Sequence, residues 1–209
     1  NGQAKRSCLI KMSRANGCTV ETVESLAPSA GQLHPLQYAF AVENAIQCGF
    51  CTPGMLMAGR ALLDHNPAPS EAEIRHALRH NLCRCTGYAS IVRAVQRAAG
   101  MLSAGIQAVD FPTAAESGGE NGLLGQDLLD KNALAAVRGE ICYGTDLTVA
   151  GMLYGKIKWA DLPSAKIVNI DDGEALRVPG VRMVLTGKDV LGSNRVGQLR
   201  RDQPGIVLD

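Results

Sequence analysis

Two close pairs of cysteines are the residues most able to do chemistry in this sequence. Cys48 and Cys51 have two residues between them, and Cys83 and Cys85 have one. Thiols at such short spacings hold metal ions or metal clusters, or they form disulfides. If the two pairs meet in the fold, four thiolates need a positively charged centre. The pattern therefore predicts that these four residues share one centre.

Three kinds of centre compete for the four cysteines. Disulfides need an oxidising compartment, and pairing is awkward across the one-residue gap between Cys83 and Cys85. Structural zinc prefers two pairs that each have two intervening residues, and one pair departs from that habit. A 2Fe–2S cluster takes two thiolates per iron, which suits two unlike pairs. Spacing alone favours the iron–sulfur cluster and leaves zinc and disulfides open.

Helices are the elements that must position these cysteines. Apolar residues recur at helical spacing in four segments, residues 35–47, 54–65, 70–81 and 88–99. Ser70 and Glu73 form a capping box at the start of the third segment. One cysteine pair falls in the turn between the first two helices, and the other falls between the last two. Two helical hairpins packed side by side, with both turns at one end, would bring the four sulfurs together.

Strand-like segments flank the helices, so the predicted fold class is α+β. Residues 1–27 contain three short strand-like runs, at 8–10, 19–20 and 22–23. Residues 103–122 are small and polar and include Pro112, which predicts a linker.

Residues 123–209 are predicted to form a mixed α/β module. Strands are expected over residues 153–159, 166–170 and 181–186. A short helix over residues 173–178 follows the capping pair Asp171–Asp172.

Composition excludes several classes of protein. The chain has 209 residues, a net charge of +1 and only 4% aromatic residues, which does not favour binding to nucleic acid. No apolar run approaches the roughly 18 residues of a membrane span, and no signal peptide opens the chain. We therefore expect no membrane span and a cytoplasmic location. The chain begins at Asn1 and stops after a strand-like run, so we expect a piece of a longer protein.

The residues around the cysteines resemble a known family. Residues 47–55 read QCGFCTPGM and residues 81–88 read NLCRCTGY. These motifs resemble the 2Fe–2S-binding helical domain of the xanthine dehydrogenase and aldehyde oxidoreductase family of molybdenum hydroxylases, and the resemblance covers residues 34–97. It implies that one 2Fe–2S cluster is bound by Cys48, Cys51, Cys83 and Cys85. It also implies that Gln47 and the backbone around Cys85 face the pterin of a molybdopterin-type molybdenum cofactor.

The flanking segments resemble neighbouring domains of the same family. Ser7–Cys8 resembles the closing segment of a plant-type ferredoxin domain, where Cys8 would be the fourth ligand of a second 2Fe–2S cluster. The other three ligands of that cluster are not in this chain. Residues 151–189 resemble the opening of the molybdopterin-binding large subunit. The implied domains are a C-terminal ferredoxin remnant, the helical cluster domain, a linker and the N-terminal α/β part of the molybdopterin-binding domain: residues 1–27, 28–102, 103–122 and 123–209.

The resemblance implies the electron-transfer portion of a molybdenum hydroxylase, which oxidises an aldehyde or an N-heterocycle with water as the oxygen source. No flavin domain fits in this chain, so a flavin subunit or an acceptor protein would receive the electrons. The expected partner is the remainder of the enzyme, in an oligomer. The family's catalytic glutamate lies beyond Asp209, so no catalytic residue is assigned. The alternative is a non-catalytic iron–sulfur or zinc module that carries electrons or serves as a scaffold.

Overall fold

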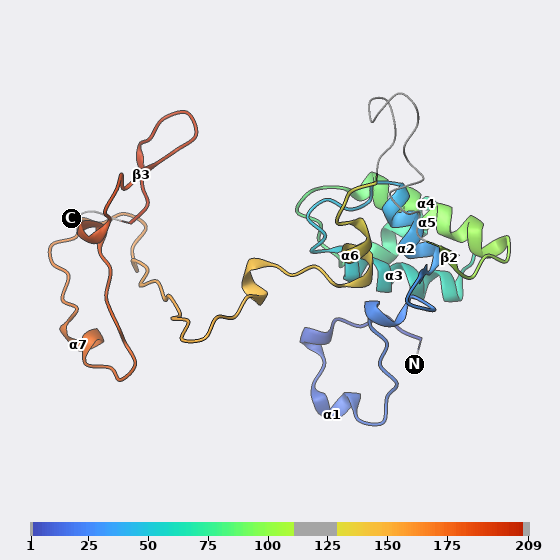
Figure 1. The fold of residues 1–209 in the computed structure, drawn as a ribbon, viewed down its shortest axis with the longest axis horizontal. Coiled ribbons are helices and arrows are strands. Elements are labelled where there is room, and N and C mark those ends of the chain that lie inside the picture. The colour runs from blue at the N-terminus through green and yellow to red at the C-terminus, as the bar shows by residue number, and fades with distance from the viewer. Residues whose placement is uncertain (1, 111–128, 207–209) are drawn as a thin grey trace. The chain divides into compact units, whose positions relative to one another are not determined.

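The computed structural model of the chain describes residues 2–110 and 129–206. The chain divides into two compact units, Asn1–Thr148 and Val149–Asp209. Figure 1 shows that the longer helices belong to the first unit.

The four predicted helices are all present in the first unit. They are α2 (Pro35–Val42), α3 (Thr52–His65), α4 (Glu71–Leu78) and α5 (Tyr88–Ser103). The prediction placed the end of the first helix five residues too late. Asn44 has a φ of 49°, in the left-handed region that ends a right-handed helix. The first cysteine pair therefore lies in a longer loop than the sequence suggested.

Side-chain caps explain where two of these helices begin. The predicted capping box is present in α4, because the Ser70 hydroxyl accepts from the Glu73 N–H at 3.3 Å. The Glu73 carboxylate in turn accepts from the Ser70 N–H at 2.8 Å. His34 caps α2, since its Nδ1 accepts from the Leu36 N–H at 3.1 Å. Pro35 occupies the first helical position, where a missing N–H costs nothing.

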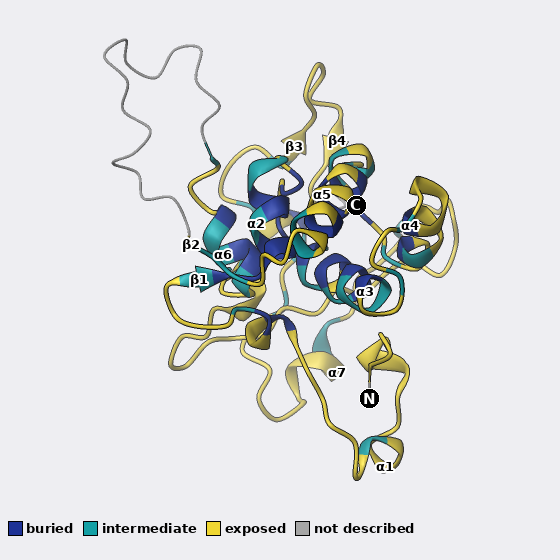
Figure 2. Cartoon of the chain, turned by 90° about the vertical axis from the view of Figure 1, so that its right-hand side faces the viewer, coloured by how far each residue is buried: buried dark blue, intermediate teal, exposed yellow. Residues whose placement is uncertain are grey.

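The closest helix packing joins α2 to α5, and α3 packs next most closely on α4. The first and last helices are thus neighbours, a pairing that two sequential hairpins did not predict. Gly59 of α3 permits close approach, because a Cβ there would lie 3.3 Å from Leu36 and 3.5 Å from Val95. Buried apolar side chains pack between these helices. Figure 2 colours the buried stretches of the helices dark blue.

Ion pairs at the end of α2 reinforce its packing on α5. The Glu43 carboxylate lies 2.6 Å from Arg97 Nε and 3.3 Å from Arg93 Nε. The hydrogen bond from Arg97, with the further hydrogen bond from Arg93, holds the pKa of Glu43 below its ordinary value. The two ion pairs fix the point at which the chain leaves α2 and enters the loop that carries Cys48 and Cys51.

A segment beyond the expected linker also packs on the helical unit. Helix α6 (Ala133–Arg138) contacts α2 and α3 and buries Ala133, Ala136 and Val137. The wholly buried Gln37 donates from Nε2 to the Val137 carbonyl at 2.8 Å. The domain predicted over residues 123–209 had assigned this helix to the following module. Helix α6 instead belongs to the first unit, because it completes the hydrophobic core.

The predicted linker, residues 103–122, lies largely outside the described residues. In its described part, Ser103 ends α5 and strand β2 (Val109–Asp110) pairs antiparallel with β1 (Gln32–Leu33). The chain therefore returns to the helical unit before it passes out of the described range.

The strands predicted in residues 1–27 are not present. Residues 2–27 contain instead two 3₁₀ turns, η1 (Ser7–Leu9) and η2 (Val23–Ser25), and one turn of helix, α1 (Met12–Ala15). Extended backbone needs a neighbouring strand for its N–H and C=O groups. Within the described residues, no strand pairs with this segment.

The second unit has little regular structure. It contains α7 (Gly173–Leu176), η5 (Gly187–Asp189) and an antiparallel pair, β3 (Arg195–Val196) with β4 (Gln203–Pro204). The predicted helix is confirmed over four residues. The strands expected over residues 153–159, 166–170 and 181–186 are not formed in this unit.

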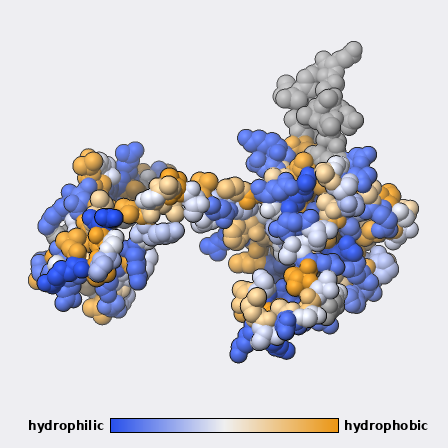
Figure 3. Space-filling view, turned by 60° about the horizontal axis from the view of Figure 1, so that its bottom comes forward, coloured by the Kyte–Doolittle hydropathy of each residue, from blue (hydrophilic) through white to orange (hydrophobic). Residues whose placement is uncertain are grey.

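Large apolar side chains of the second unit are exposed, which explains the missing strands. Trp159 is 72% exposed and Val168 is 93% exposed. Figure 3 shows hydrophobic residues at the surface of this unit. Because sheets are stabilised by covering one face, these segments lack the packing that would turn them into strands. Among the described residues, no helix combines the length and the apolar character needed to cross a bilayer.

Candidate metal centre

The structure brings the two cysteine turns together. We define the first cysteine loop as residues 47–51 and the second cysteine loop as residues 81–87. A Cβ on Gly87 would lie 3.4 Å from Nε2 of Gln47, and one on Gly54 would lie 2.8 Å from Nδ2 of Asn81. Both loops therefore lie at the same end of the helices, as the sequence predicted.

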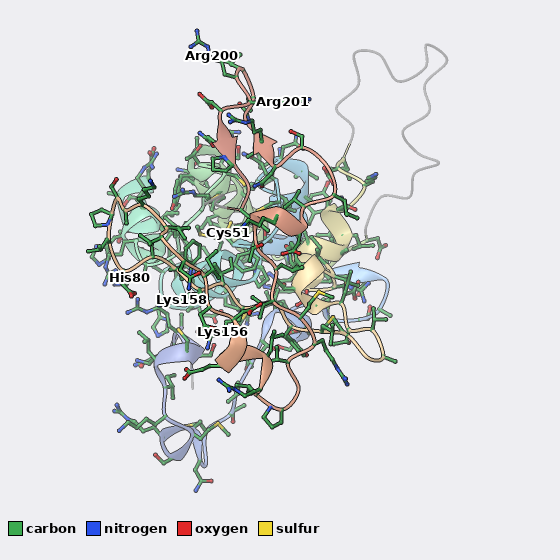
Figure 4. The ribbon with its side chains drawn as sticks, turned by 90° about the vertical axis from the view of Figure 1, so that its left-hand side faces the viewer. Cys51, His80, Lys156, Lys158, Arg200 and Arg201 are labelled. Carbon is green, nitrogen blue, oxygen red and sulfur yellow. The ribbon has the colours of Figure 1, made fainter. Side chains whose placement is uncertain are left out.

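Cys51 is the link between the two loops. Burial, together with the interaction with Cys83 and the charge of Cys48, raises the pKa of its thiol to about 12. The Cys51 and Cys83 side chains are close enough for each to shift the pKa of the other. Figure 4 labels Cys51 within the helical unit. Three of the four predicted ligands are therefore close enough to interact.

Cys83 lies in a cradle of hydrogen-bond donors. Burial raises its pKa, but the backbone N–H of Gly87, the Cys51 thiol and the backbone N–H groups of Cys85 and Thr86 lower it, and the net shift is downward. Thr86 adopts a φ of 58°, which is uncommon for a residue with a β-branched side chain. Such donors stabilise a thiolate, the form in which cysteine binds metals.

The Tyr88 hydroxyl fixes the second cysteine loop. It accepts a hydrogen bond from the Cys83 N–H at 2.8 Å and donates one to the Asn81 carbonyl at 3.2 Å. Sequence analysis placed Tyr88 only at the start of the last helix. The hydroxyl role could not be derived from helical periodicity, which reports the apolar ring alone.

The first cysteine loop is held from a distant part of the chain. The Tyr143 hydroxyl donates to the Cys48 carbonyl at 3.0 Å, and its ring meets Phe50 edge to face at 5.5 Å between centroids. Burial, together with the charges of Cys48 and Cys51, raises the pKa of Tyr143. Sequence reasoning missed Tyr143, because no local pattern connects it to a loop almost one hundred residues earlier.

The predicted site residues differ in exposure. Cys83 is buried, Cys51 and Cys85 are half-buried, and Cys48 is exposed. Gln47 is exposed beside Gly87. Cys8 is an exposed thiol in η1, so the structure does not bring it into the centre.

The residues present fit a group that needs thiolates and hydrogen-bond donors. Besides the cradle around Cys83, the Thr52 hydroxyl, next to Cys51, is buried with no hydrogen-bond partner in the described part of the chain. A buried hydroxyl without a partner is costly, and a sulfur atom of a bound group would satisfy it. In the described ranges, no set of three or more His, Cys, Asp or Glu residues is arranged to hold a single metal ion.

Comparison with known proteins connects this centre to a family. The [2Fe-2S] binding domain matches residues 22–96, and the a/b hammerhead domain of aldehyde oxidase and xanthine dehydrogenase matches residues 138–208. The chain is 37% identical over 202 residues to the aldehyde oxidoreductase of Megalodesulfovibrio gigas, which covers 94% of this chain. The chain belongs to the aldehyde oxidase and xanthine dehydrogenase family. It spans 22% of the length of that relative.

Other members of the family match part or most of the chain. The nicotine 6-hydroxylase small subunit of Paenarthrobacter nicotinovorans is 50% identical over 102 residues, which are 49% of this chain and 61% of that subunit. The crystal structure of the aldehyde oxidoreductase from Desulfovibrio desulfuricans superposes with a TM-score of 0.72 at 37% identity, over 93% of this chain and 22% of that one. The chain therefore spans about one fifth of the aldehyde oxidoreductases of this family and about three fifths of the separate small subunit.

Proposed function

We propose that this chain is the electron-transfer portion of a molybdenum-dependent hydroxylase. A 2Fe–2S cluster would be held by Cys48, Cys51, Cys83 and Cys85. The observation that carries the proposal is the meeting of the two cysteine loops in a unit that matches a [2Fe-2S] binding domain, followed in the same chain by a match to the hammerhead domain. A simple electron carrier would have no need of the second match.

The overall reaction sets what the chain must do. Oxidation of a substrate C–H group to C–OH consumes one water and releases two protons and two electrons. A 2Fe–2S cluster supplies one-electron chemistry, so the two electrons leave singly. The chain's own residues provide the thiolates and the N–H donors around Cys83. The hydrophobic core, on which Cys51, Cys83 and Cys85 pack, excludes water from that side of the centre. Aldehydes and N-heterocycles are the proposed substrate classes, in keeping with the names of the relatives.

The exposed side of the centre is the proposed route for electrons. Gln47 and the half-buried Cys85 would contact the pterin of a molybdopterin-type cofactor, because they come from adjacent loops at the same end of the helices. Cys8 would complete a second 2Fe–2S cluster with three cysteines supplied upstream of Asn1. Electrons would continue to a flavin subunit or an acceptor protein, and the remainder of the enzyme, as an oligomer, would be the partner.

Elemental analysis of the full-length enzyme tests the proposal. We expect iron and acid-labile sulfide in equal amounts, together with molybdenum, and a reduced-state electron paramagnetic resonance signal that disappears in Cys51→Ser. Cys142→Ser is the matched control, because Cys142 is an exposed thiol outside the two cysteine loops. Zinc without sulfide would refute the redox function. Iron and sulfide without molybdenum would favour a non-catalytic carrier.

A further inference from the structure

We propose that Tyr143 is a positioning residue for the cluster bound by the first cysteine loop. The proposal rests on the function proposed above, since it assigns a role toward a 2Fe–2S cluster at Cys48 and Cys51. Tyr143 lies within the segment that matches the hammerhead domain, whereas the loop that it holds lies within the [2Fe-2S] match. A residue of the second module would thus set the geometry of the first module's ligands.

Two separate contacts join Tyr143 to the first cysteine loop. Its hydroxyl donates to the carbonyl of Cys48 at 3.0 Å. Its ring meets the ring of Phe50 edge to face, with an interplanar angle of 72°. The polar contact fixes the backbone at one candidate ligand, and the aromatic contact fixes the residue just before the next. Together they restrict the loop between Cys48 and Cys51.

The space around Gly49 shows that the fit is close. A Cβ at Gly49 would lie 2.6 Å from Cδ1 of Ile141, 3.1 Å from the Tyr143 hydroxyl and 3.4 Å from Cβ of Ala136. The φ of Gly49 is 81°, which also disfavours a side chain. The loop therefore lies directly against residues 136–143.

The segment that carries Tyr143 is itself anchored. Ala136 and Val137 of α6 are buried, and the Val137 carbonyl accepts from Gln37. On the other side, the Tyr143 N–H donates to the Asp146 carboxylate at 2.8 Å, which closes the turn η4 (Gly144–Asp146). A fixed backbone on both sides makes the tyrosine a support with a defined position.

This contact has a consequence for the potential of a cluster. Hydrogen bonds and solvent access near the ligands set the potential of a 2Fe–2S centre. The hydroxyl neutralises the negative end of the Cys48 carbonyl dipole, and the ring covers part of the exposed loop. Removing the hydroxyl leaves that dipole uncompensated beside the cluster, which favours the oxidised state.

The test compares Tyr143→Phe with wild type in the full-length enzyme. We expect a lower midpoint potential for the cluster and about fivefold faster loss of its iron to a chelator, with the iron content of the purified enzyme unchanged. Tyr38→Phe is the control, because Tyr38 packs on the same core from α2. That control should keep the wild-type potential and rate. The signal of this cluster is identified by its absence in Cys51→Ser.

The outcomes separate the two proposals. If Cys51→Ser removes no signal and no iron, the proposed function fails and the role of Tyr143 fails with it. If Cys51→Ser removes the signal while Tyr143→Phe has the wild-type potential and the wild-type release rate, only the role of Tyr143 is overturned.

Discussion

Cys83 and Cys48 differ most in exposure among the four candidate ligands. Cys83 is 6% exposed and surrounded by N–H donors, whereas Cys48 is exposed. A buried thiolate without a positive partner is costly, so Cys83 depends most on a bound metal. Cys48 depends more on the contacts that hold its backbone.

Replacement of Cys83 tests its part in the centre. We expect Cys83→Ser to lower the iron content of the full-length enzyme to about half, because a serine hydroxyl is a poor ligand for iron–sulfur clusters and only the second proposed cluster would remain. Iron and sulfide assays and the visible absorbance measure the change. Cys18→Ser is the control, since Cys18 is exposed and its thiol donates to the Arg14 carbonyl in its own turn. Equal iron in both variants would contradict the assignment.

Tyr88 offers a second test at the scale of one residue. Tyr88→Phe removes the acceptor of the Cys83 N–H and the donor to the Asn81 carbonyl. An unpaired group in this half-buried position costs about 1–3 kcal/mol. We expect hydrogen exchange at the Cys83 amide to become about tenfold faster or more, measured by mass spectrometry. An unchanged exchange rate would show that the hydroxyl does not hold the loop.

The sequence alone suggests the candidate ligands but not the residues that support them. Closely spaced cysteines in a sequence most often bind metals or form disulfides. The pairs at 48–51 and 83–85 can therefore be recognised as candidate ligands without a structure. Tyr143 and Thr52 carry no such signal. The first acts across nearly one hundred residues, and the second is distinguished only by burial without a partner.

At the scale of elements, local signals decided which predictions were right. Ser70 with Glu73 marks a helix start that the structure confirms. The predicted strands have no comparable local cause, because a strand is stabilised by its neighbours in a sheet and by the face that it covers. The segments predicted as strands in residues 2–27 and 149–206 have no paired strand beside them and leave their apolar side chains largely exposed. This explains why the strand predictions were wrong.

The cap of α2 makes the helical unit sensitive to pH. Burial, aided by the charge of Arg60, lowers the pKa of His34 to about 4, while Asp64 acts in the opposite direction. Neutral Nδ1 accepts from the Leu36 N–H, and a protonated ring could not. The folded pKa lies below the unfolded value of about 6.5, so this stability is complete above pH 6.5 and is lost as pH falls toward 4.

Urea unfolding of the cluster-free chain measures this effect. We expect the free energy of unfolding to be about 2 kcal/mol lower at pH 5 than at pH 7. His34→Gln should remove most of that difference, whereas His65→Gln, at the exposed end of α3, should keep it. A pH dependence that survives His34→Gln would assign the effect to other groups.

At the scale of the whole molecule, the first unit extends past the helices that hold the cysteines. Helix α6 and Tyr143 belong to this unit, although both follow the predicted linker. Sequence analysis placed the boundary where composition changes, near residues 103–122. Amino-acid composition distinguishes polar, linker-like stretches from apolar ones. It does not show that a later segment packs on a core formed by earlier helices.

Shortened chains test this extension. A chain that ends at Thr148 keeps α6 and Tyr143, and one that ends at Asp110 loses both. We expect the shorter chain, reconstituted with iron and sulfide, to release iron several-fold faster than the longer one. It should also bind more of a dye specific for apolar surface, because the faces of α2 and α3 that α6 covers become exposed. Identical behaviour would mean that α6 adds nothing to the centre.

The pairing of β1 with β2 gives the first unit a further property. Asp110 is held on this unit by its pairing with Gln32, and Leu129 is held by its packing against the hydrophobic core. Once both ends of a connection are fixed, lengthening it costs free energy only logarithmically, about 0.6 kcal/mol for each doubling. Evolution or an engineer could therefore splice a whole new domain, or a purification tag, between these two points while leaving the fold on either side intact.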